Sequence, residues 1–62
     1  MAQMLIVDNH PVMRQYLGEL LAKEGHEVHA AEDGLAALDS LRTLRPQVIF
    51  VDLIMPTIDG LA

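Results

Sequence analysis

The sequence predicts an α/β fold with a parallel three-stranded sheet, and two observations support this prediction. Apolar runs that fit strands alternate with amphipathic segments that fit helices, in the order strand, helix, strand, helix, strand. Two of the runs, residues 4–7 and 48–51, are unbroken and each is followed by an aspartate, as expected for strands covered on both faces. Right-handed crossovers make the strands parallel. We expect the order 2-1-3, with the two most apolar runs as neighbours.

The first helix is expected to follow the first strand. Asn9 is a good N-cap residue, and Pro11 fits the first helical turn. Gly25 fits the position just after the helix, where a left-handed backbone is common. Between these signals, apolar residues recur at helical spacing: Met13, Tyr16, Leu17, Leu20 and Leu21.

The remaining elements follow in the same way. Residues 26–30 alternate as a strand near an edge, and residues 32–34 (EDG) form a turn. Leu35, Leu38 and Leu41 mark a second helix, which ends before Pro46. The third strand, residues 48–51, is expected to be buried.

Composition excludes several classes of protein. The chain has 62 residues, enough for one small domain, and its 52% hydrophobic content is too high for a disordered tail. It has no cysteine, which excludes a disulfide scaffold, a thiolate zinc site and a cysteine nucleophile. No apolar run is long enough to span a bilayer, and the N-terminus lacks the features of a secretory signal. We therefore expect a cytoplasmic protein that does not contact membranes.

The charge balance argues against direct binding of nucleic acid by this segment. The formal net charge is −5, and contact with phosphates needs clustered cations. The four basic residues are instead scattered along the chain: Arg14, Lys23, Arg42 and Arg45.

Two aspartates mark the candidate site. Asp8 and Asp52 follow the first and third strands, and the carboxyl ends of neighbouring parallel strands meet where ligands bind. Two carboxylates in one crevice repel each other, and a hard cation such as Mg²⁺ relieves that repulsion. A single aspartate at a strand end is also explained as a helix cap or turn residue. His10 lies near this crevice, but a surface position at the helix start explains it as well.

Several segments together resemble the receiver domains of response regulators in two-component signalling. The resemblance runs from about residue 4 to residue 62, and its most specific part is the stretch DxxMPxxDG. The matching segments are residues 7–11 (VDNHP), 13–14 (MR), 25–28 (GHEV), 31–34 (AEDG), 37–38 (AL), 51–56 (VDLIMP) and 59–61 (DGL).

This resemblance implies a flavodoxin-like fold and a role for each residue of the site. Asp52 matches the aspartate that accepts a phosphoryl group from a sensor histidine kinase or a histidine phosphotransfer protein. Asp8 matches the first residue of the acidic pair that binds Mg²⁺. Asn9 stands where the second acidic residue usually is, so the metal site has one charge fewer. Ile54 matches a position that supplies a backbone carbonyl to the metal.

Receiver domains of this family are about twice as long, so residues 1–62 are expected to form a partial domain that ends after the third strand. The family's later lysine, which stabilises the phosphoryl charge, has no counterpart in the sequence. We therefore expect this chain alone to be an impaired phosphoacceptor.

Two alternatives to phosphorelay signalling remain open. The edge of the third strand, residues 48–51, is apolar, so two copies could pair there and form a homodimer that needs no phosphorylation. A small phosphohydrolase that uses the two aspartates and Mg²⁺ is the other alternative. It is the weaker one, because the sequence pairs no general acid or base with Asp52, so we expect a phosphoacceptor and not an enzyme.

Overall fold

The computed structural model describes residues 2–52. The elements are β1 (Gln3–Val7), α1 (Pro11–Lys23), β2 (Glu27–Ala31), α2 (Gly34–Ser40) and β3 (Val48–Val51). The predicted α/β order is therefore confirmed. Neither helix of this part of the chain is long and apolar enough to cross a membrane.

The three strands are parallel and have the predicted order, β2-β1-β3. The register pairs Val7 of β1 with Ala31 of β2 and with Val51 of β3. The pairing continues one residue further, because the backbone N–H of Asp52 donates to the carbonyl of Val7 at 2.9 Å. Asp8 and Asp52, which follow β1 and β3, therefore emerge side by side at one edge of the sheet.

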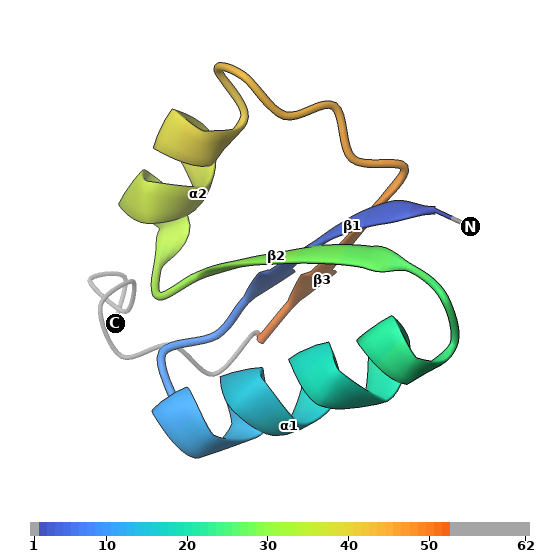
Figure 1. Ribbon diagram of the computed structural model, residues 1–62. Coiled ribbons are helices and arrows are strands. Elements are labelled where there is room, and N and C mark those ends of the chain that lie inside the picture. The colour runs from blue at the N-terminus through green and yellow to red at the C-terminus, as the bar shows by residue number, and fades with distance from the viewer. Residues whose placement is uncertain (1, 53–62) are drawn as a thin grey trace.

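The two helices lie on opposite faces of the sheet (Figure 1). On the α2 face, the core consists of Leu5, Val7, Ala31 and Ala37. On the other face, α1 packs against β2 at Gly18, where an added Cβ would lie 3.9 Å from Val28. Strand β1 is therefore covered on both faces and paired on both edges, and its residues 4–7 are buried.

The expectation of a buried third strand is wrong. All four side chains of β3 are exposed, by 37–51%. Within residues 2–52, both helices pack on β1 and β2, and neither packs on β3. Apolar composition places this segment correctly as a strand, but burial requires covering elements, and the described part of the chain provides none over β3.

Two of the three leucines that mark the predicted second helix are not buried. Leu35 and Leu38 are exposed by 80% and 65%, whereas Ala37 is buried and Ala36 and Leu41 pack against the core. The helix contains only seven residues. The contact of this helix with the core is therefore made mainly by alanine side chains, and the two leucines face outward.

The helix ends confirm one predicted cap, correct a second and reveal a third. Gly25 has a φ of +91° directly after the first helix, as predicted. The N-cap of α1 is His10 and not Asn9, and no side chain caps it. Asp33, predicted only as a turn residue, is the N-cap of α2, and its Oδ1 accepts the backbone N–H of Ala36 at 2.8 Å.

Replacing Asp33 by alanine should lower the free energy of unfolding by about 1 kcal/mol, because the N–H of Ala36 loses its acceptor. The matched control is Asp39→Ala, which removes only an exposed pair with Arg42 and should change stability by less than about 0.5 kcal/mol. Urea unfolding measures both values. Equal losses in the two variants would contradict the assigned cap.

Candidate functional site

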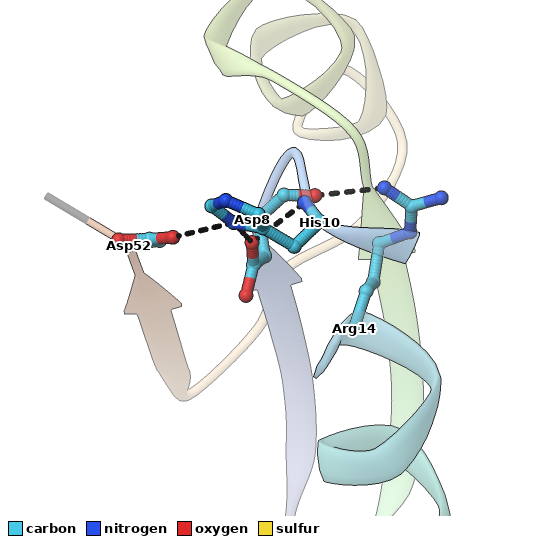
Figure 2. A network of polar contacts seen from close by, with 4 residues as sticks. All are labelled: Asp8, His10, Arg14 and Asp52. Atoms are coloured by element: carbon cyan, nitrogen blue, oxygen red, sulfur yellow. Dashed lines mark hydrogen bonds and ion pairs between the residues drawn. The ribbon is translucent and has the colours of Figure 1, made fainter. Parts of the chain in front are cut away.

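The candidate site lies at the carboxyl ends of β1 and β3, the edge where parallel sheets bind ligands. Asp8 and Asp52 meet there, and His10 lies between them (Figure 2). One oxygen of each carboxylate and Nδ1 of His10 all lie within 4.8 Å of one another. The structure thus brings together two side chains that are far apart in the sequence.

His10 contacts both carboxylates. Its Nδ1 lies 3.0 Å from Oδ1 of Asp8 and 3.2 Å from Oδ2 of Asp52. The ring is still 55% exposed, as expected for a residue at the surface, but it also contacts the site. The expectation that Asp52 has no acid–base partner is wrong, because this imidazole is one. Its position two residues after Asp8, at the start of a helix on the ligand edge, is the sequence signal for this contact.

Asp8 is the buried, anchored member of the site. The backbone N–H of His10 donates to its Oδ1 at 2.8 Å, and Nη1 of Arg14 donates to its backbone carbonyl at 2.7 Å. The backbone N–H of His10 is the main reason why the pKa of Asp8 is below its ordinary value, and the imidazole adds to this effect. Burial acts in the opposite direction but does not prevail. Asp8 is therefore a fixed negative charge at neutral pH.

The two carboxylates raise the pKa of His10. Its hydrogen bond to Asp8 is the main cause of a raised imidazole pKa, and the negative charge of Asp8 and the contact with Asp52 add to it. Desolvation lowers the same pKa by a smaller amount. When it is protonated, the imidazole therefore offsets the repulsion between the two carboxylates.

In an NMR titration of the metal-free chain, His10 should show a pKa above 6.5, the ordinary histidine value. Because the folded-state pKa is the higher one, the contact stabilises the fold fully below pH 6.5, and this contribution disappears as pH rises through the folded-state pKa. Asp52→Asn should move the pKa of His10 toward 6.5, whereas Asp39→Asn should leave it unchanged. A pKa at or below 6.5 in the unmodified chain would contradict the bridging geometry.

The oxygen donors of the site fit a divalent cation. Besides the two carboxylates, Oδ1 of Asn9 is buried and accepts no hydrogen bond within residues 2–52. Carboxylate and amide oxygens are the ligands that Mg²⁺ prefers. Asp8, Asn9 and Asp52 are thus available as donors on one edge of the sheet. Ile54, predicted to supply a carbonyl, lies outside the described residues.

The other two histidines have separate local partners. Nδ1 of His26 accepts the backbone N–H of Ala2 at 3.1 Å. Nε2 of His29, within β2, lies 2.7 Å from a carboxylate oxygen of Glu27. Neither belongs to the group formed by Asp8, His10 and Asp52. Within residues 2–52, the three histidines therefore do not form one ligand set.

Comparison with known proteins identifies relatives over nearly the whole chain. The profile of the response regulator receiver domain matches residues 4–62. The chain is 42% identical over 59 residues to protein-glutamate methylesterase/protein-glutamine glutaminase 1 of Anaeromyxobacter dehalogenans, covering 95% of this chain and 17% of the relative. It is 44% identical over 62 residues to a methylesterase/glutaminase of Rhodospirillum rubrum, covering 98% of this chain and 17% of the relative.

A third relative belongs to another type of protein. The chain is 37% identical over 59 residues to the response regulator MprA of a Mycobacterium species, covering 95% of this chain and 26% of the relative. The chain therefore spans about a sixth to a quarter of the length of these relatives.

Proposed function

The chain belongs to the response regulator receiver domain family, whose members act in phosphorelay signalling, and from this premise we propose that Asp52 is its phosphoacceptor. The observation that carries the proposal is the difference between the two carboxylates. The side chain of Asp8 is 9% exposed and anchored by the backbone, whereas that of Asp52 is 22% exposed at the open end of β3. The more accessible carboxylate is the one that a phosphoryl donor can reach.

The proposed donor is a phosphohistidine on a sensor histidine kinase or a histidine phosphotransfer protein. A carboxylate oxygen of Asp52 attacks the phosphorus, and the nitrogen–phosphorus bond breaks with its electron pair going to the donor imidazole. Asp52 then carries an acyl phosphate. A cytoplasmic location agrees with this proposal, because such donors obtain their phosphoryl group from ATP.

The proposed metal is Mg²⁺, which when bound shields the charge on the incoming phosphoryl oxygens. Asp8 and Asp52 would hold it, Asn9 would contribute its unpartnered amide oxygen, and Ile54 would contribute its backbone carbonyl. Asp8 suits this role because its lowered pKa keeps it ionised at neutral pH.

The contact between His10 and Asp52 also bears on the phosphohydrolase alternative. A general base must be unprotonated to take a proton from water. The raised pKa of His10 keeps the imidazole protonated to higher pH, and the same ring is held by Asp8. We therefore propose a phosphoacceptor and not an enzyme.

The test uses acetyl phosphate as the donor, with and without Mg²⁺, followed by mass spectrometry of the intact chain and of its peptides. We expect one phosphoryl group, in low yield, located on Asp52 and present only when Mg²⁺ is added. Incorporation at another residue, or none with Mg²⁺, would contradict the proposal.

Exposure of β3 supports self-association as a second candidate function. Its four apolar side chains are exposed, and within residues 2–52 it pairs with β1 alone. Two copies could pair their β3 edges antiparallel about a two-fold axis. Light scattering should then show a dimer that Ile49→Lys disrupts and that Leu35→Lys, on the outer side of α2, leaves intact. A monomeric mass at micromolar concentration would contradict this candidate.

A further inference from the structure

We propose that Asp8, His10 and Asp52 form a three-ligand site for a borderline divalent transition-metal ion such as Zn²⁺ or Co²⁺, with His10 binding through Nδ1. The inference rests on the proposed function, because it concerns which metal the phosphoacceptor site prefers. It goes beyond that function by adding an imidazole nitrogen to a set of oxygen donors.

The spacing of the three donor atoms supports the proposal. Zinc binds nitrogen and oxygen ligands at about 2.0–2.2 Å, so adjacent ligands around one ion lie about 2.8–3.6 Å apart. Nδ1 of His10 lies 3.0 Å from the Asp8 oxygen and 3.2 Å from the Asp52 oxygen. Both separations fall in that range, and the three donor atoms lie within 4.8 Å of one another. Two of the three separations therefore match those of adjacent ligands around one ion.

The chemistry of the nitrogen determines the class of metal. Magnesium takes oxygen ligands, whereas imidazole suits zinc and the later first-row transition metals. A single N–H at Nδ1 cannot make two linear hydrogen bonds to two carboxylates. A metal ion between the three atoms would satisfy both carboxylates, with Nδ1 giving up its proton and Nε2 keeping one.

The surroundings hold the ligands in position. Oδ1 of Asp8 accepts the backbone N–H of His10, and Arg14 fixes the Asp8 carbonyl at the start of α1 (Figure 2). Such supporting contacts orient the ligands of metal sites. Between Asp8 and His10 in the sequence, Asn9 has a buried oxygen without a hydrogen-bond partner in the described part of the chain.

The chain contains a matched control for His10. His29 also faces a carboxylate, that of Glu27, at 2.7 Å. His29 and Glu27 do not belong to a group of three possible metal ligands. Within the described residues, the one such group consists of Asp8, His10 and Asp52. Removing His29 therefore removes an imidazole beside a carboxylate without touching the proposed site.

The experiment titrates the chain separately with Zn²⁺ and with Mg²⁺ by calorimetry, and compares His10→Gln with His29→Gln. We expect His10→Gln to weaken Zn²⁺ binding about 10-fold or more, since even supporting residues of metal sites are worth that much. Binding of Mg²⁺ should not weaken in the same variant, because the substituted residue offers oxygen and no longer places a positive imidazole between the carboxylates. His29→Gln should change neither affinity.

A second measurement on the unmodified chain uses ¹⁵N NMR of the imidazole rings. Addition of Zn²⁺ should shift Nδ1 of His10 and leave the rings of His26 and His29 unchanged. Equal Zn²⁺ affinity in the chain and its His10→Gln variant, or a His10 ring that does not respond to Zn²⁺, would overturn the proposal. Both measurements are made without a phosphoryl donor, so their failure is separate from a failure of Asp52 to accept phosphate.

Discussion

Asp52→Asn should abolish magnesium-dependent phosphorylation completely. An amide is a much weaker nucleophile toward phosphorus than a carboxylate, and the substitution also removes one charge from the proposed metal site. The fold should survive, because asparagine has nearly the same shape and the side chain is partly exposed. Intact-mass spectrometry after incubation with acetyl phosphate and Mg²⁺ measures the result.

The matched control for this prediction is Asp39→Asn, which alters an aspartate on the exposed side of α2. It should leave phosphorylation at the level of the unmodified chain. A phosphoryl group that persists in Asp52→Asn would show that another residue is the acceptor.

Asp8→Asn should give a different result, because Asp8 is proposed to hold the metal and not to attack phosphorus. Asparagine can still accept the backbone N–H of His10, so the loop before α1 should keep its conformation. Phosphorylation should fall at low Mg²⁺ and recover as the Mg²⁺ concentration rises. No such recovery is expected for Asp52→Asn, and recovery in both variants would contradict the separate roles.

The parts of the fold that were predictable depend on local patterns and on topology. Residues 48–51 match β3 because the run is apolar and is followed directly by Asp52. The strand order follows from right-handed crossovers together with the placement of the most apolar runs side by side. The same order places Asp8 and Asp52 at one edge of the sheet, so their proximity is predictable from the sequence.

The parts that were not predictable depend on what surrounds a residue. The exposure of β3 depends on which other elements cover the strand, and the sequence of the strand itself does not show this. The outward position of Leu35 and Leu38 reflects which side of α2 packs against the sheet. The bridge made by His10 depends on a side-chain rotamer and on the start of α1 at Pro11, one residue after His10 itself.

Leu5→Ala should remove a large part of the stability of the chain. Leu5 is fully buried in the central strand, where it lies between His29 of β2 and Ile49 of β3 and belongs to the core on the α2 face. Truncating a buried leucine to alanine costs about 2–5 kcal/mol. A chain of 62 residues has roughly 3–9 kcal/mol in total, so the unfolded fraction should become large.

Urea unfolding followed by circular dichroism tests this expectation against two controls. Leu35→Ala removes a leucine that is 80% exposed and should cost less than about 0.5 kcal/mol. Leu5→Met conserves most of the volume and should cost less than about 1.5 kcal/mol. A loss in Leu5→Ala as small as that in Leu35→Ala would show that the described core does not stabilise the chain.

Unfolding of β1 should also separate the residues of the site, because Asp8 directly follows this strand and is held in place by it. Leu5→Ala should therefore lose phosphorylation together with its circular dichroism signal, and Leu5→Met should keep both. Asp8→Asn and Asp52→Asn should lose phosphorylation while keeping that signal. This difference separates residues that act at the site from a residue that only supports it, and it connects the core on the α2 face to the chemistry at the sheet edge.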